Sequence, residues 1–315
     1  MKVLVAGATG AVGRRLTQQL VAAGHRVAAL VRSPEKAEEL RQTGVQAMVV
    51  DAFDRSAVRS AILEARPEVV VHEMTALRSA SDLIHFDRAF ATTNRLRTEA
   101  LDHLLGAAEE SGARRFVAQS FCGWPYARTG GPVKTEEDPL DPDPPREMRR
   151  ALDAIRHLES SVAGSRRLEG VVLRYGAFYG ARSGLFDGPF IGQVRARRAP
   201  MIGDGGGWWS FLHLDDAASA TALAIETGAP GVYNLVDDEP APVREWLPAL
   251  AAMLGAKPPF RIPAFLARIA LGEHLVALMT ENRAGSNRKA REALGWRPAY
   301  ASWRQGFAEV VAQGD

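Results

Sequence analysis

The chain has 315 residues, of which 46% are hydrophobic and 24% charged, and its formal net charge is +2. This composition is ordinary for a globular protein of one large or two modest domains, and it gives no reason to expect nucleic acid or an acidic membrane as partner. The single cysteine, Cys122, excludes an internal disulfide framework and fits a reducing cytoplasm, which is the expected location. We expect neither a membrane span nor a signal peptide.

The first predicted element is a buried parallel strand over residues 2–6, and a glycine-rich turn follows it at once. Apolar residues then recur at helical spacing as far as Gly24. Glycines between a strand and a helix admit a phosphate close to the helix N-terminus, where free N–H groups favour negative charge. An ordinary tight turn is the alternative. The strand before the glycines and the helix after them favour a dinucleotide site. The residues expected to form it are Gly7, Thr9, Gly10, Ala11, Val12 and Gly13.

Strand-like and helical runs alternate up to about residue 174. The predicted strands are 26–31, 46–50, 68–72, 114–120 and 170–174, and the predicted helices are 35–43, 55–65, 82–112 and 146–163. Right-handed crossovers between parallel strands need a helix, so this alternation predicts an α/β fold with a doubly wound parallel sheet. We interpret residues 1–174 as a dinucleotide-binding Rossmann domain.

From about residue 175 the pattern changes to glycine-rich loops, short strands and separate helices. It predicts a smaller C-terminal, substrate-binding lobe over residues 175–315, with some chain returning to the Rossmann domain. The strands expected here are 210–214 and 232–235, and the helices are 215–227, 243–254, 264–279 and 303–311.

In such a fold the ligand lies outside the carboxyl ends of the strands. Arg32 follows the second strand, where an arginine suits the 2′-phosphate of NADP(H) and an acidic residue would suit NAD(H). A solvated loop arginine is the alternative; we favour NADP(H), with NAD(H) as the second choice. Asp51 can accept from an adenine amino group, although helix capping by the nearby Asp54 is a structural explanation for acids here. The remaining cofactor contacts expected at strand ends are Ser33, Ala52, Met74, Thr75 and Ala76.

At this point the chain resembles the extended short-chain dehydrogenases/reductases of the NAD-dependent epimerase/dehydratase superfamily, along nearly its whole length. Besides the glycines and Asp51, the matching fragments are Asn94, Arg115-Phe116-Val117, Leu173-Arg174-Tyr175-Gly176, Tyr179-Gly180, Phe211-Leu212-His213-Leu214-Asp215-Asp216-Ala217, Gly231-Val232-Tyr233-Asn234 and Leu294-Gly295-Trp296-Arg297-Pro298. The resemblance implies a nicotinamide cofactor with further contacts from Asn94, Tyr175 and Gly176. It also implies a small-molecule substrate and a homodimer formed through the fourth and fifth helices.

One departure from the family matters more than the matches. Members ordinarily carry a tyrosine, followed four residues later by a lysine, at the start of the fifth helix, and the phenol acts as acid or base. This sequence has no such pair, and no lysine lies between Lys134 and Lys257. Ser120 and Tyr126 are therefore the candidate catalytic residues. Capping of a strand end by Ser120 and packing of the Tyr126 ring are the alternatives, and Cys122 is interpreted as a buried thiol.

The candidate substrate contacts are Trp124, Trp209 and His213. The long polar loop over residues 127–147 is expected to be a lid or a substrate-contacting wall. Packing of the tryptophan over the second lobe, and a structural role for His213 between the lobes, are the alternatives. No cluster of histidine, cysteine or carboxylate residues has metal-ligand spacing, so no metal is expected.

Three functions follow from these observations. The first is an NADP(H)-dependent oxidoreductase, most simply a ketoreductase acting on a small secondary metabolite, in which positioning drives hydride transfer. The second is a nucleotide-sugar epimerase or dehydratase, whose first step needs the base that is missing here. The third is a non-catalytic NADP-binding protein that reports redox state to a partner.

Overall fold

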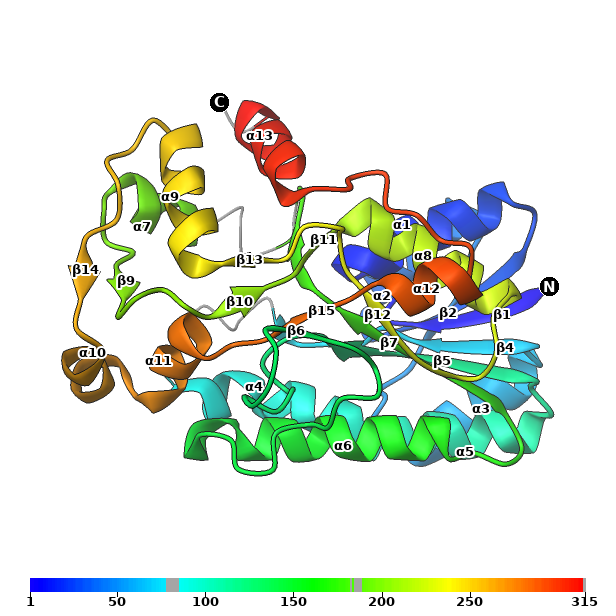
Figure 1. The fold of residues 1–315 in the computed structure, drawn as a ribbon. Coiled ribbons are helices and arrows are strands. Elements are labelled where there is room, and N and C mark those ends of the chain that lie inside the picture. The colour runs from blue at the N-terminus through cyan, green and yellow to red at the C-terminus, as the bar shows by residue number, and fades with distance from the viewer. Residues whose placement is uncertain (78–84, 182, 184–188, 314–315) are drawn as a thin grey trace.

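The computed structural model describes residues 1–77, 85–181, 183 and 189–313. Its centre is a seven-stranded sheet in the order β12-β7-β5-β4-β1-β2-β3, with every neighbouring pair parallel (Figure 1). The strands are β1 (Lys2–Ala6), β2 (Arg26–Val31), β3 (Gln46–Val49), β4 (Val69–His72), β5 (Arg115–Phe121), β7 (Glu169–Tyr175) and β12 (Gly231–Leu235). The predicted α/β fold with a doubly wound sheet is confirmed.

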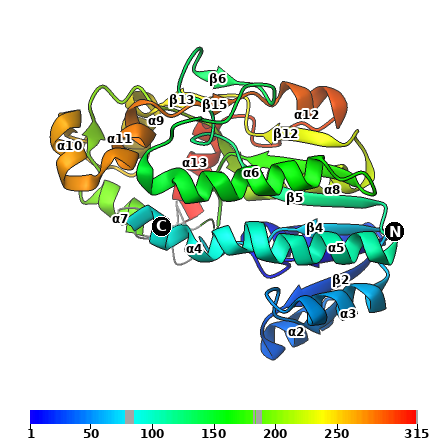
Figure 2. The ribbon, with the colours of Figure 1, turned by 90° about the horizontal axis from the view of Figure 1, so that it is seen from below.

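Helices cover both faces of this sheet (Figures 1 and 2). Alternate residues of a strand point to opposite faces, so Val3 and Val5 of β1 belong to one core cluster and Leu4 and Ala6 to the other. The helices over the first face are α1 (Ala11–Ala22), α2 (Pro34–Arg41), α8 (Leu214–Glu226) and α12 (Arg288–Ala293). Those over the second face are α3 (Arg55–Ala65), α5 (Leu101–Ser111) and α6 (Arg149–Ala163).

Two helices predicted as continuous are interrupted. The described part of the helix expected over 82–112 is α4 (Phe86–Arg95), a π-helical turn (Leu96–Ala100) and α5; residues 82–84 lie outside the described residues. The helix expected over 264–279 is two, α10 (Ala264–Leu271) and α11 (Glu273–Thr280), because Gly272 has φ +93° and breaks the hydrogen-bond ladder. A short 3₁₀ turn (Arg146–Met148) precedes α6.

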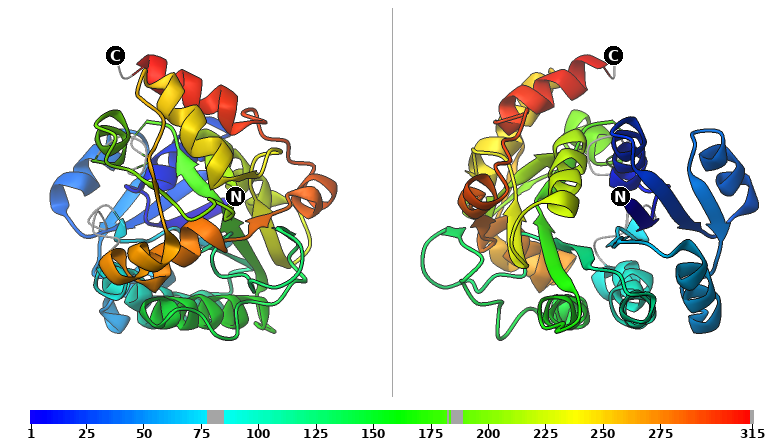
Figure 3. Two further views of the ribbon diagram at one scale, coloured as in Figure 1. Left: turned by 60° about the vertical axis from the view of Figure 1, so that its left-hand side comes forward. Right: turned by 90° about the vertical axis from the view of Figure 1, so that its right-hand side faces the viewer.

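The second lobe packs helices around short strand pairs at one end of the sheet (Figure 3). Its helices are α7 (Pro189–Arg195), α9 (Val243–Met253), α10, α11 and α13 (Trp303–Gln313). The strand pairs are β8 (Ala177–Tyr179) with β11 (Phe211–His213), β9 (Met201–Ile202) with β14 (Arg261–Ile262), β10 (Trp208–Trp209) with β13 (Ala241–Pro242), and β6 (Val133–Lys134) with β15 (Ala284–Gly285).

The strand predicted at 232–235 was wrongly grouped with the short strands of the second lobe. It is β12, which pairs with β7 along its full length and forms one edge of the main sheet. Its local sequence looks like that of a short lobe strand, and only pairing with a partner about sixty positions earlier, Leu173 opposite Tyr233, assigns it to the sheet. The division of the chain at residue 174 stays a prediction.

The strand order reverses between β1 and β4, and in a doubly wound sheet this is where a ligand crevice forms. The segments that follow β1 and β4 therefore meet at one place. Over the part of the chain that the structure describes, no helix combines the length and apolarity needed to cross a bilayer.

Candidate active site

The turn between β1 and α1 is closed by its glycines. Gly7 has φ +103°, and a Cβ atom there would stand 2.6 Å from the backbone carbon of Glu73, after β4. A Cβ at Gly13 would stand 2.2 Å from the carbonyl oxygen of Gly7. Gly10 is the N-cap of α1 and has no side chain to occupy the first N–H groups, and the first turn contains no acidic residue. These features fit a dinucleotide phosphate at the helix N-terminus.

The end of the site expected to hold the adenosine lies at the carboxyl ends of β2 and β3. Arg32 is exposed and forms no hydrogen bond or ion pair with any described residue. Ser33 caps α2 by accepting from the Lys36 N–H at 3.2 Å, and Asp54 caps α3. The carboxylate of Asp51 accepts from its own loop, from the Phe53 N–H at 3.0 Å. An apolar wall beside them contains Ala52, Phe53, Met74, Ala76 and Leu96.

Two buried ionisable groups, His72 and Glu73, lie at the carboxyl end of β4, and burial favours the neutral form of each. His72 accepts from the Met74 N–H through Nδ1 and donates through Nε2 to the Leu96 carbonyl, and burial lowers its pKa to about 4. Burial raises the pKa of Glu73 to about 8. The Tyr175 hydroxyl donates to Glu73 at 2.7 Å. Tyr175 is therefore linked through Glu73 to the glycine turn, because the Glu73 backbone lies against Gly7, while Gly176 packs against the Ser210 carbonyl.

Both candidate catalytic hydroxyl groups belong to one buried polar network. Ser120 donates to Glu159 of α6 at 2.7 Å, and Glu159 forms a bidentate ion pair with Arg174 at 2.8 and 2.5 Å. Arg174 also donates to the Tyr126 hydroxyl at 2.9 Å, and that hydroxyl donates to Asn234 at 2.7 Å. Burial raises the pKa of Tyr126. Each hydroxyl thus donates its hydrogen bond to a protein acceptor, Ser120 to Glu159 and Tyr126 to Asn234. A catalytic role for either residue stays a prediction.

Helix α6 provides neither of the residues that the family uses as its acid–base pair. Its sequence, RRALDAIRHLESSVA, contains no tyrosine and no lysine. The side that faces the protein carries Ala151, Ala154, Ile155 and Leu158, all buried. Glu159 is the buried acidic residue on this side.

A narrow pocket lies between the end of β5, the start of α6 and α11. Trp124, Tyr126, Met148 and Leu278 form its apolar walls, and Arg128 and Asn282 are among its polar residues. The Tyr126 hydroxyl is engaged with Arg174 and Asn234. The cavity measures about 10 Å³, the size of one water molecule, so a larger ligand can enter only if a wall moves.

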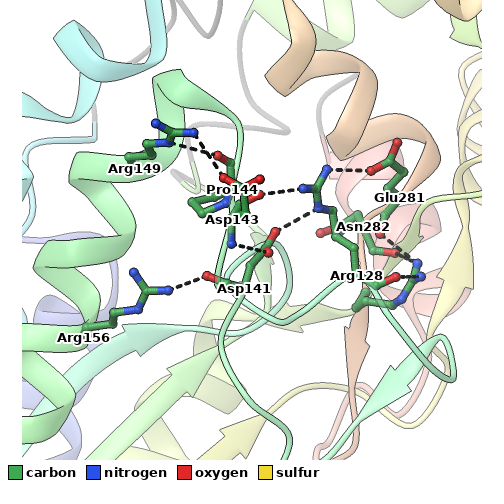
Figure 4. Close-up of polar contacts among 9 residues, drawn as sticks. Arg128, Asp141, Asp143, Pro144, Arg149, Arg156, Glu281 and Asn282 are labelled. Atoms are coloured by element: carbon green, nitrogen blue, oxygen red, sulfur yellow. Dashed lines mark hydrogen bonds and ion pairs between the residues drawn. The ribbon is translucent and has the colours of Figure 1, made fainter.

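The loop over residues 127–147 forms one wall of this pocket, and arginines hold it in place (Figure 4). Arg128 donates to Asp141 at 2.8 Å and to Glu281, at the end of α11, at 2.7 Å. From α6, Arg149 donates to Asp143 at 3.1 Å and Arg156 to the Asp141 carbonyl. The loop is thus tied to both neighbouring elements, and its role as a lid stays a prediction.

The three predicted substrate contacts are not brought together. Trp124 and Trp209 share one apolar cluster, and Trp209 donates to the Leu278 carbonyl at 3.1 Å. His213 lies elsewhere: it caps α8 by accepting from the Asp215 N–H, and its ring lies 3.8 Å from that of Tyr300. These contacts match the structural alternative for His213.

Sequence reasoning missed Arg97, Glu159 and Asn234 as members of the site. The signal for Arg97 was present, because it falls on the inward-facing stripe of its helix between Leu96 and Ala100. No pattern pointed to Glu159, and Asn234 appeared only at the end of the family-matching fragment Gly231-Val232-Tyr233-Asn234, with no role attached to it. Among the described residues there is no group of three or more histidine, cysteine or acidic side chains able to hold a metal ion.

A doubly wound sheet with a glycine-closed turn at the point of strand reversal, and a second lobe beyond it, is the architecture of the extended short-chain dehydrogenase/reductase class. The model of the NAD dependent epimerase/dehydratase family matches residues 3–235. The chain belongs to that family, and without the tyrosine–lysine pair it is an atypical reductase of it.

Individual relatives agree with this assignment. A 3-diazoavenalumate denitrifying reductase from a Streptomyces species is 47% identical over 98% of this chain and 99% of its own. A 4-hydroxy-2-methyl-3-oxo-4-farnesyl-3,4-dihydroquinoline-1-oxide ketoreductase from Stigmatella aurantiaca is 31% identical over 94% of this chain and 87% of its own. The structure of Thermus thermophilus UDP-glucose 4-epimerase in complex with NAD has a TM-score of 0.73 and 26% identity, covering 100% of this chain and 99% of that one. The cofactor is a nicotinamide dinucleotide; a homodimer stays a prediction.

Proposed function

We propose that the protein is an NADPH-dependent reductase that replaces the diazo group of an aromatic diazo acid by hydrogen. The bound reduced nicotinamide supplies a hydride. For a diazonium group the balanced change is R–N₂⁺ + NADPH → R–H + N₂ + NADP⁺, which neither consumes nor releases a proton. The 47% identity to the Streptomyces denitrifying reductase over nearly the whole of both chains supports this substrate class.

The observation that carries the proposal is the state of the candidate proton donors. The hydroxyl groups of Ser120 and Tyr126 already donate to Glu159 and Asn234. Reduction of a ketone leaves an alkoxide that must be protonated, and the family's tyrosine–lysine pair normally does this. Loss of N₂ needs no such donor. The arrangement therefore suits an electrophile whose reduction depends on positioning.

The pocket walls support an aromatic substrate. Trp124, Tyr126, Met148 and Leu278 are apolar wall residues of the kind that pack against a planar ring, and a ring would enter only after one wall moves, because the cavity itself is about 10 Å³. For the cofactor, Arg32 supports NADPH over NADH, because it is exposed, has no partner among the described residues, and a guanidinium forms charge-assisted bonds to a 2′-phosphate.

The test is isotope transfer. Purified protein is given an arenediazonium carboxylate and NADPH deuterated at the hydride-donating carbon. We expect N₂ release, loss of NADPH in equal amount, and deuterium on the arene carbon, while the same reaction with ordinary NADPH in D₂O leaves the arene unlabelled. Deuterium arriving from solvent, or N₂ release without NADPH oxidation, would overturn the proposal.

Ketone reduction is the second candidate, and the ketoreductase from Stigmatella aurantiaca supports it. In this case Tyr126 would be the proton donor. The contact with Arg174 at 2.9 Å gives the phenol a cationic neighbour that would stabilise the phenolate after proton transfer. A ketone substrate distinguishes the two candidates, since its turnover should depend on Tyr126.

A further inference from the structure

Arg97 is a buried cation, and two of its three guanidinium nitrogens have no hydrogen-bond partner among the described residues. Its side chain is 3% exposed, and within the described chain its Nε and Nη1 atoms are buried without an acceptor. Glu159 is an opposite charge that acts on Arg97, but its carboxylate oxygens already accept from Ser120 and Arg174. A buried charge that lacks partners is costly, so a ligand that completes its hydrogen bonds is expected.

A second unsatisfied group lies beside it. Asn94 precedes Arg97 by three positions, so both side chains project from the same side of the helix. The Oδ1 atom of Asn94 is also buried without a donor from the described residues. Next to it, the Thr93 hydroxyl accepts from the Ala76 N–H at 3.1 Å, which ties this side of the helix to the segment after β4.

We infer that Arg97 and Asn94 together bind the two hydroxyl groups of the ribose that carries the nicotinamide ring. The inference rests on the nucleotide binding in the proposed function and adds a residue pair for one part of the cofactor. A hydroxyl group both donates and accepts, so a vicinal diol can donate to Asn94 and accept from Arg97. An ionised carboxylate could satisfy only the arginine.

The position along the helix indicates which ribose is bound. Leu96 packs with Ala52 and Phe53, at the adenosine end of the crevice. Arg97, one residue further on, belongs to the π-helical turn that packs against α6, and Glu159 of α6 contacts Ser120 near the carboxyl end of β5. The π-helical turn that begins at Leu96 accompanies this inward placement, as is common at functional sites.

Calorimetric titration of Arg97→Met with two ligands tests the inference. One ligand is NADPH, and the other is 2′-phosphoadenosine 5′-diphosphate, which has the adenosine half and lacks the nicotinamide ribose. We expect affinity for NADPH to fall roughly 10- to 100-fold, as for loss of a charge-assisted hydrogen bond, with affinity for the fragment unchanged. Arg97→Lys should restore part of the loss. Without ligand, Arg97→Met should melt at or above the wild-type temperature, because an unpartnered charge has been removed.

Arg115→Met is the matched control. Arg115 is also buried, but it is fully paired with Glu169 and with backbone carbonyls at the opposite end of β5. This variant should melt at a lower temperature and keep its affinity for both ligands. Arg97→Met binding NADPH as tightly as wild type, or losing both ligands equally, would overturn the inference. A wild-type protein that binds no pyridine nucleotide would instead overturn the proposed function.

Discussion

The hydroxyl of Ser120 donates to the carboxylate of Glu159 across 2.7 Å, and the same carboxylate holds Arg174 in a buried ion pair. The side chains of Arg174 and Glu159 are 6% and 8% exposed. The network therefore has little solvent to compensate for the loss of one member. Its charges must be balanced by each other, and this makes its energetics testable.

Glu159→Gln should destabilise the protein strongly. The variant keeps the size of the side chain and removes its charge, which leaves Arg174 buried without a counter-ion. The expected loss is about 3–5 kcal/mol in the free energy of unfolding, measured by urea denaturation. Glu110→Gln is the control, because it breaks an exposed pair with Arg59 and should cost less than about 1 kcal/mol. Equal losses would show that the buried pair is not a stabilising unit.

Tyr126→Phe should lower stability and leave turnover of a diazo acid nearly unchanged. The change removes a buried hydroxyl that bridges Arg174 and Asn234, which is expected to cost about 1–3 kcal/mol. The measurements are thermal denaturation and kcat of the same preparation. A folded variant whose kcat falls more than about 100-fold would make Tyr126 the proton donor, as ketone reduction requires.

Arg32→Ala should weaken NADPH binding much more than NADH binding. The guanidinium has no partner among the described residues and is proposed to bind the 2′-phosphate, so its loss should cost roughly 10- to 100-fold in the Kd of NADPH. Arg41→Ala, in the neighbouring helix α2, is the control for a general change in surface charge. An equal loss for both nucleotides would refute the preference for NADP(H).

Glu73 should make the folded state less stable as the pH rises. Its pKa is raised from 4.5 to about 8 in the folded protein, while the unfolded chain keeps the ordinary value. Between these pH values the folded state holds a proton that the unfolded state has lost. The stability from this group is therefore fully present below about pH 4.5 and is lost as the pH approaches about 8.

The variant Glu73→Gln isolates this contribution, because an amide can still accept from Tyr175 and does not titrate. The difference in melting temperature between wild type and variant should change steadily from about pH 5 to about pH 8. Glu64→Gln, at an exposed position of α3, should show a difference that does not depend on pH. A flat profile for Glu73→Gln would mean that Glu73 is ionised throughout.

Two of the sequence predictions that went wrong had a physical cause that is visible in the structure. The apolar spacing across 264–279 continues through Gly272, so the sequence predicted one helix. The structure has two, because Gly272 adopts a positive φ and ends the first helix. The sequence of the strand at 231–235 is compatible with pairing in the lobe and with pairing in the main sheet. A short apolar run does not specify which strand it pairs with or in which register.

The sequence by itself determined the parallel sheet, the glycine-closed turn and the absence of the family's acid–base pair, because periodicity, glycine spacing and missing residues are local properties. Only the tertiary structure decided what the candidate side chains touch. Tyr126 and Asn234 are 108 positions apart, Ser120 and Glu159 are 39 apart, and the contacts of Arg97 depend on how one helix turns against another. Such partners are set by strand register and helix packing, and these depend on the whole core at once.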